Sequence, residues 1–156
     1  MKLCDIIITD AMQPQMVATS RNEAIGELVE KLVDTGAVGS EISAKVIKAV
    51  VTRENKATTG IGKGVAIPHA SLDCVDKPIA TIGLSTDGID FNSLDNKPVY
   101  AVVLLVSNKD KPEEHLDAME ALFSRIKDDR FRKLLFQSRS TDALIDLIEE
   151  ADTDEK

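Results

Sequence analysis

The stretch Thr58–Ala70 reads TTGIGKGVAIPHA, and the rest of the chain is organised around it. It holds three of the chain's eight glycines within five residues, followed by the apolar run Val65–Ile67 and then by Pro68 and His69. Glycine lets main-chain N–H groups approach a ligand closely, whereas proline fixes its own φ and keeps the preceding residue extended. The stretch therefore predicts a flexible loop and a short strand that presents a histidine at its end, beside loop N–H groups able to cradle an anion.

Length and composition bound the class of protein. With 156 residues the chain has the size of one ordinary domain, and 43% hydrophobic residues can build its core. The net charge of −8 disfavours nucleic-acid binding, which needs clustered basic residues. The chain has no Trp and one Tyr, so it also lacks the aromatic side chains on which bases stack. Asp5 and Asp10 interrupt the N-terminal apolar run. We therefore expect neither a signal peptide nor direct insertion into a membrane.

The two cysteines, Cys4 and Cys74, lie far apart and form no CxxC pair. Their spacing predicts neither a disulfide framework nor a zinc cluster. We expect a reduced, cytoplasmic chain in which Cys74 is a bystander.

Apolar side chains at helical spacing predict five helices. Ser20 and Glu23 have the spacing of a capping box, and proline is well suited to the first turn of a helix. The predicted helices are the segment between Ser20 and Gly36, residues 41–53, the segment from Pro112 to Ile126, residues 130–137 and a last helix capped by Thr141. We expect the acidic tail, residues 151–156, to fray.

Apolar runs predict the strands. Residues 99–106 are almost wholly apolar, as in a central strand that is covered on both faces. The other predicted strands are 65–67, 79–85 and 15–19, and residues 3–8 form either a turn or a strand. Because helices and strands mix along the chain without internal repeats, we expect residues 1–156 to form one α/β domain. Its mixed β-sheet should have about five strands, with helices on both faces.

The second of the two histidines, His115, falls in the first turn of the helix that follows the predicted central strand. That position is near the carboxyl end of the strand, where α/β sheets form their binding crevices. The same position is also at the edge of the helix's apolar stripe, where a histidine could simply fill space. Since both histidines fall at the ends of elements, a functional role is favoured.

Three chemistries compete for the glycine loop. A nucleotide loop is disfavoured because Gly64, rather than Ser or Thr, follows Lys63, and because Val65 occupies the place of the third small residue of a dinucleotide fingerprint. Both motifs also require a helix where a strand is predicted. A metal site is disfavoured because the histidines lack carboxylates at ligand spacing.

The third chemistry makes His69 a nucleophile that carries a phosphoryl group, because neutral imidazole attacks phosphorus through its unprotonated nitrogen. The site must then neutralise roughly −1.5 to −2 of added charge. The groups available for this are the Arg53 guanidinium, an N–H of His115, the hydroxyls of Thr58 and Thr59, and the backbone N–H groups of the loop around Gly60 and Gly62. Arg53 could instead cap its own helix, and the two threonines could be ordinary loop residues.

Glu54, Ile61–Gly62 and Val65–Ala70 together resemble the active-site signature of IIA components of the bacterial phosphotransferase system. The subtype is the fructose, mannitol and nitrogen-regulatory one. Arg53 upstream and Glu114–Leu116, read as EHL, extend the resemblance, which covers essentially the whole chain.

The resemblance implies that His69 accepts a phosphoryl group on Nε2 from the phosphohistidine of HPr or its paralogue NPr, so that a backbone acceptor should hold Nδ1–H. Arg53 and His115 would flank the phosphoryl group, and no metal, nucleotide or other cofactor is implied. The acceptor would be a IIB domain in sugar uptake. In the alternative, the protein is a regulator that binds target proteins according to its phosphorylation state. The sequence names neither a sugar nor a target.

Overall fold

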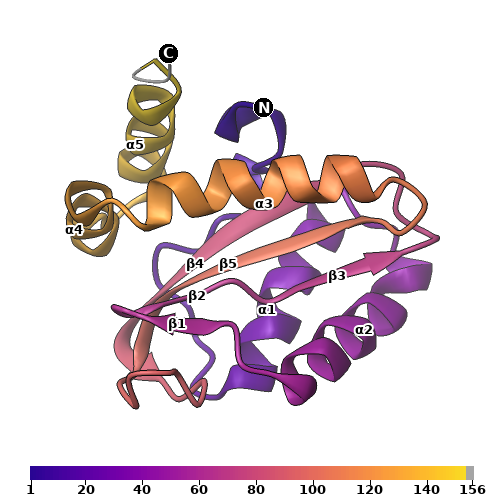
Figure 1. Cartoon of the computed structure of the whole chain (residues 1–156), viewed down its shortest axis with the longest axis horizontal. Coiled ribbons are helices and arrows are strands. Elements are labelled where there is room, and N and C mark those ends of the chain that lie inside the picture. The colour runs from indigo at the N-terminus through magenta and orange to yellow at the C-terminus, as the bar shows by residue number, and fades with distance from the viewer. Residues whose placement is uncertain (154–156) are drawn as a thin grey trace.

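Strand β5 lies at the centre of the fold in the computed structural model, which describes residues 1–153 (Figure 1). The strands are β1 (Gly60–Gly62), β2 (Val65–Ala66), β3 (His69–Leu72), β4 (Ile79–Ile89) and β5 (Val99–Asn108). β4 runs antiparallel along one edge of β5. β2 and β3 follow one another along the opposite edge, both parallel to β5. They make one strand interrupted at Ile67 and Pro68, and β1 pairs antiparallel with β2 on the outside.

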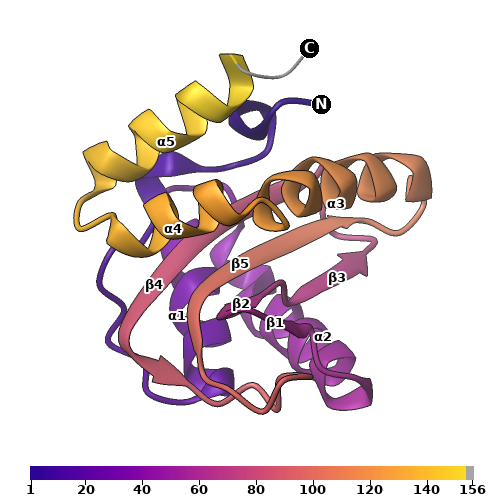
Figure 2. The ribbon, with the colours of Figure 1, turned by 60° about the vertical axis from the view of Figure 1, so that its left-hand side comes forward.

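The side chains of β5 alternate between two buried cores. Ala101, Val103 and Leu105 belong to one core, and the residues between them belong to the other. The first core lies under α3 (Pro112–Ile126), α4 (Asp129–Gln137) and α5 (Thr141–Thr153), and the second under α1 (Arg21–Asp34) and α2 (Ser43–Lys56) (Figures 1 and 2). This two-sided burial explains the apolar run of β5 and confirms the predicted α/β fold.

Most predicted helices begin where expected. Ser20 Oγ accepts the backbone N–H of Glu23 at 3.3 Å, so Ser20 caps α1 as its spacing predicts. At α5 the cap is Ser140, whose Oγ accepts the N–H of Ala143 at 3.1 Å, and the prediction of Thr141 is wrong by one residue. No helix within residues 1–153 is long and apolar enough to cross a membrane.

The predicted strand at residues 15–19 is absent. The N–H groups of Val17 and Ala18 instead donate to the carboxylate of Glu27 on α1, at 3.0 and 2.8 Å, and so cannot join a ladder. The N-terminal segment follows the outer edge of β4 through two isolated bridges, at Ile7 and Gln13. The same segment contains two short 3₁₀ turns, Leu3–Asp5 and Thr9–Ala11.

The two ends of the chain are joined at α5. Asp152 is buried, and its carboxylate accepts the N–H groups of Leu3 and Cys4 at 2.7 and 3.0 Å. The predicted fraying is therefore wrong for residues 151–153, which continue α5 beside the N-terminal turn (Figure 2). The remainder of the predicted tail, residues 154–156, lies outside the described residues.

Candidate active site

The glycine-rich loop forms a tight β-hairpin between β1 and β2. Gly62, Lys63 and Gly64 all have positive φ, at 101°, 60° and 82°, and they make the turn. The turn precedes β2, whereas His69 follows it, so about 15 Å of extended chain separates Gly64 from His69. This separation keeps Gly62 away from His69. The positive φ of Gly62 is required by the turn of the hairpin.

The backbone polar groups of Gly60 are also hydrogen-bonded within the protein. Its N–H donates to Thr58 Oγ1 at 3.0 Å, and its carbonyl accepts the N–H of Leu94 at 3.0 Å. A Cβ at this position would lie 2.4 Å from Ser93 Oγ, so the absence of a side chain allows two segments to pack closely. The predicted anion cradle around Gly60 and Gly62 is thus replaced by a structural turn.

The hydroxyls of Thr58 and Thr59 donate to acceptors outside the glycine-rich loop. Thr58 Oγ1 donates to the carbonyl of Phe91. The N–H and the hydroxyl of Thr59 both donate to the buried carboxylate of Glu54, each at 2.7 Å. Glu54 sits in the last turn of α2 and therefore fixes the loop to that helix. Since both hydroxyls have intramolecular partners, we remove Thr58 and Thr59 from the phosphoryl-binding set.

His69 is the first residue of β3 and lies directly after Pro68. Its Nδ1 is 2.8 Å from the carbonyl oxygen of Ile67, which accepts the Nδ1–H and leaves the lone pair on Nε2. The expected backbone acceptor is therefore present. Burial lowers the pKa of His69, and the positive charge of Arg53 lowers it further, while the Ile67 carbonyl and Glu54 act in the opposite direction. The ring is thus neutral near pH 7.

His115 lies against His69, with 5.6 Å between the two ring centroids and 43° between the ring planes. Burial lowers the pKa of His115, followed by the effect of His69. His115 Nδ1 is 2.6 Å from Ser107 Oγ at the end of β5, and Ser107 Oγ is 3.2 Å from Ser71 Oγ on β3. The sequence analysis predicted neither serine as part of the site. The sequence signal for Ser107 is its position directly after the apolar run of residues 99–106.

Arg53 lies in the last turn of α2, and Figure 1 shows α2 and α3 on opposite sides of β3. Its Nη1 donates to the carbonyl of Ala57 at 2.9 Å. Arg53 therefore caps the C-terminus of its own helix, which was one of the two roles considered for it. It also lines an open groove beside His69, between α2 and β3. The structure therefore brings together three of the predicted site residues, His69, His115 and Arg53.

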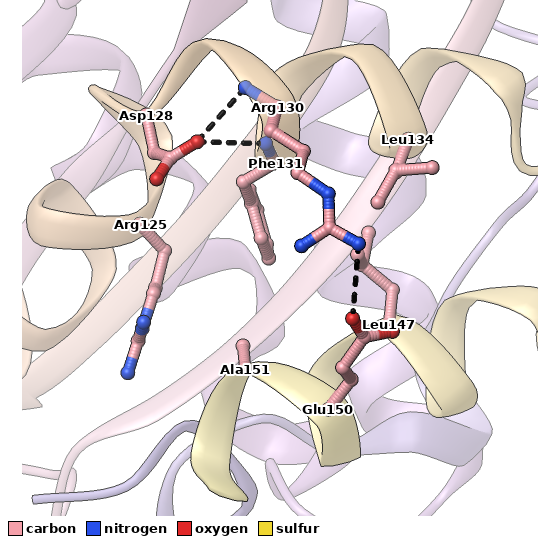
Figure 3. Close-up of a pocket in the computed structure, with 8 residues that line it drawn as sticks. All are labelled: Arg125, Asp128, Arg130, Phe131, Leu134, Leu147, Glu150 and Ala151. Carbon is pink, nitrogen blue, oxygen red and sulfur yellow. Dashed lines mark hydrogen bonds and ion pairs between the residues drawn. The ribbon is translucent and has the colours of Figure 1, made fainter. Parts of the chain in front are cut away.

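A second, smaller cavity lies between the end of α3, α4 and α5 (Figure 3). Three of its four charged side chains serve the local structure: Asp128 accepts the N–H groups of Arg130 and Phe131, and the Arg130 guanidinium donates to Glu150 at 3.4 Å. Neither histidine lines this cavity. Within residues 1–153, no three His, Cys, Asp or Glu side chains are grouped to hold a metal ion.

The fold and the site together define an α/β protein with a partly buried histidine at the start of a short parallel strand, beside a second histidine. Residues 6–151 match the family model of the phosphoenolpyruvate-dependent sugar phosphotransferase system, EIIA 2. The chain therefore belongs to this family, as its sequence signature predicted.

The relatives include sugar-specific and regulatory proteins. The chain is 33% identical to the fructose-specific EIIA component of Haloferax volcanii over 84% of each chain. It is 31% identical to the fructose-specific EIIABC component of Bacillus subtilis over 97% of its own length but only 24% of that longer protein. It is 28% identical to a nitrogen regulatory protein of Bradyrhizobium diazoefficiens over 95% of each chain.

Solved structures share the fold. Nitrogen regulatory protein IIA-Ntr from Neisseria meningitidis superposes with a TM-score of 0.82, at 22% identity, over 92% of this chain and 97% of that one. Mannitol enzyme IIA from Escherichia coli, solved in complex with phosphorylated mannitol enzyme IIB, gives a TM-score of 0.75, at 22% identity, over 90% of this chain and 95% of that one.

Proposed function

We propose that this chain is a cytoplasmic phosphoryl carrier in which His69 Nε2 accepts a phosphoryl group from the phosphohistidine of HPr or NPr. The group then passes to a IIB domain in sugar uptake. The observation that carries the proposal is the 2.8 Å contact between His69 Nδ1 and the Ile67 carbonyl. This contact fixes the tautomer of a neutral ring and leaves Nε2 as the nucleophile.

The transfer exchanges one nitrogen–phosphorus bond for another. The bond to the donor imidazole breaks as the bond to His69 Nε2 forms, and the donor ring recovers its lone pair. His69 keeps its proton on Nδ1, so the step needs no general base. Because the donor is already a phosphohistidine, the proposal assigns no role to a metal, a nucleotide or any other cofactor.

Two side chains are placed to balance the new negative charge. Arg53 uses one of its five N–H donors on the Ala57 carbonyl, which leaves others for phosphoryl oxygens. His115, whose ring lies 5.6 Å from that of His69, can offer one N–H. Hydrogen-bond donors aimed at developing charge are worth more in a partly buried site than in water.

The alternative function is regulation, in which the phosphorylation state decides which target protein the chain binds. Similarity to the Bradyrhizobium nitrogen regulatory protein over 95% of both chains supports it. We favour sugar transfer because the two fructose-specific relatives are the more similar, at 33% and 31% identity. Single-turnover transfer to a fructose-type IIB domain separates the two, since a dedicated regulator would not deliver the group.

The proposal is tested by incubating the protein with phosphoenolpyruvate, Enzyme I and HPr in excess EDTA. We expect mass spectrometry to detect one added phosphoryl group with an acid-labile, base-stable linkage. His69→Ala should remain folded and unphosphorylated, because a partly buried histidine at a strand end contributes little packing energy. The matched control is His115→Ala, which should still be phosphorylated, though more slowly. Phosphate retained on His69→Ala would overturn the assignment.

A further inference from the structure

Two serines and a histidine form a continuous line of hydrogen bonds behind the reactive ring. Ser71 on β3 is the register partner of Ser107 on β5, which brings their hydroxyls to 3.2 Å. Ser107 Oγ then lies 2.6 Å from Nδ1 of His115, and the ring of His115 faces His69. Ser107 is fully buried, whereas Ser71 is exposed and can exchange hydrogen bonds with water.

The direction of these bonds decides what His115 offers to the site. The lowered pKa of His115 keeps its ring neutral near pH 7, so the ring carries one N–H. If Nδ1 donated to Ser107, then Nε2 would present a lone pair, which repels an anionic phosphoryl group. If Ser107 donates to Nδ1, the proton resides on Nε2 and can be donated to phosphoryl oxygens. Ser71 completes the second arrangement by donating to Ser107.

We propose that Ser107, supported by Ser71, is a positioning residue that holds the proton of His115 on Nε2, the nitrogen that can serve the phosphoryl group on His69. This inference rests on the proposed function. It extends that function because it assigns roles to two residues that do not touch the phosphoryl group. The serines act only through His115, and no covalent step involves them.

Two variants and one matched control separate positioning from simple packing. Ser107→Ala removes the donor to His115, and Ser71→Ala removes the support for Ser107. The control is Ser93→Ala, because Ser93 is also a buried serine but its Oγ has no hydrogen-bond partner within residues 1–153. Ser93→Ala therefore matches the loss of a buried hydroxyl in Ser107→Ala, while only the changes at Ser107 and Ser71 interrupt the line of hydrogen bonds.

The first readout is the tautomer of His115 in the unphosphorylated protein, from long-range ¹H–¹⁵N spectra recorded above pH 7. We expect the Nε2–H form in wild type and in Ser93→Ala, and a mixture of both tautomers in Ser107→Ala. A wild-type Nδ1–H form would overturn the inference. This readout does not require phosphorylation, so it stands even if the protein proves not to be a phosphoryl carrier.

The second readout is single-turnover transfer from phosphorylated HPr. Ser107→Ala should slow transfer roughly tenfold, less than the 10²–10³ that loss of a direct donor can cost. Ser71→Ala should have a smaller effect in the same direction, and Ser93→Ala none. In a His115→Ala background the effect of Ser107→Ala should vanish, because coupled residues are not additive. An equal effect in both backgrounds would overturn the inference, whereas wild type that accepts no phosphate would overturn the proposed function instead.

Discussion

The β1–β2 hairpin and the start of β3 are neighbours in the chain, yet they differ in how many of their polar atoms are hydrogen-bonded within the protein. Where the chain enters the hairpin, the hydroxyls of Thr58 and Thr59 and the N–H groups of Thr59 and Gly60 all have hydrogen-bond acceptors within the protein. At the start of β3, the backbone holds one ring nitrogen of His69, and the other has no hydrogen-bond partner within residues 1–153. The comparison teaches that a cluster of glycines in the sequence can indicate a tight backbone turn rather than a ligand site. A polar side chain is available for chemistry only if the fold leaves one of its atoms without a hydrogen-bond partner.

The largest effect expected outside His69 itself is at His115. Replacing it by Ala removes a donor to developing charge, which can be worth on the order of 10²–10³ in rate. We expect a smaller loss because Arg53 remains. His115→Gln keeps a side-chain donor, so single-turnover rates with phosphorylated HPr should rank wild type, then His115→Gln, then His115→Ala. Equal rates for all three would give His115 a purely structural role.

Next in size is the effect of Thr59 on stability. Thr59→Ala leaves one oxygen of the buried Glu54 carboxylate without its donor, which should lower the free energy of unfolding by about 1–3 kcal/mol. Urea unfolding measures this change, and Thr59→Ser, which keeps the hydroxyl, is the control. Phosphoryl transfer by the folded variant should be unchanged. A variant of normal stability with slow transfer would return Thr59 to the site.

Gly62→Ala tests the turn in the same way. Gly62 has a φ of 101°, and a residue with a Cβ pays about 1–2 kcal/mol for left-handed backbone. Unfolding should become easier by that amount, with little change in the transfer rate. Gly26→Ala on α1 is the matched control, because a Cβ there would have open space and should stabilise the helix by up to about 1 kcal/mol. A transfer defect in Gly62→Ala without a loss of stability would restore the anion cradle.

The smallest expected effect is a dependence of stability on pH. The pKa values of His69 and His115 are both lowered from 6.5, chiefly by burial. The unfolded chain therefore binds more protons than the native chain just below pH 6.5, so stability should fall as the pH drops from 6.5 toward the native pKa values. NMR titration should give both midpoints below 6.5, and His69→Ala should flatten this part of the stability profile. Midpoints above 6.5 would contradict the burial of the pair.

Local patterns predicted most of the fold. The apolar run of β5 and the helical stripes of α1 to α3 reflect burial, which acts on each element separately. Two of the errors, the strand at residues 15–19 and the frayed end of the chain, arose where a residue outside the segment decides its structure. Glu27 takes the N–H groups of residues 17 and 18, and Asp152 binds the N–H groups of residues 3 and 4, almost the whole chain away. No local pattern contains those partners.

The candidate site divides in the same way. His69, His115 and Arg53 could be predicted because each is a scarce or charged group at the end of an element. The hydrogen-bond partner of the Thr59 hydroxyl could not be predicted, because Glu54 becomes its acceptor only once α2 and the hairpin are packed together. The role proposed for Ser107 could not be predicted either, since it depends on the parallel register of β3 with β5 and on the position of α3.

The central claim is that His69 reacts through Nε2 while the Ile67 carbonyl holds its Nδ1–H. Long-range ¹H–¹⁵N spectra of the phosphorylated protein, labelled with ¹⁵N at histidine, test it most directly. We predict a phosphorus-coupled Nε2 resonance of His69, together with a retained Nδ1–H, and no phosphorylation of His115. Phosphate on Nδ1 of His69, or on any other residue, would contradict the account.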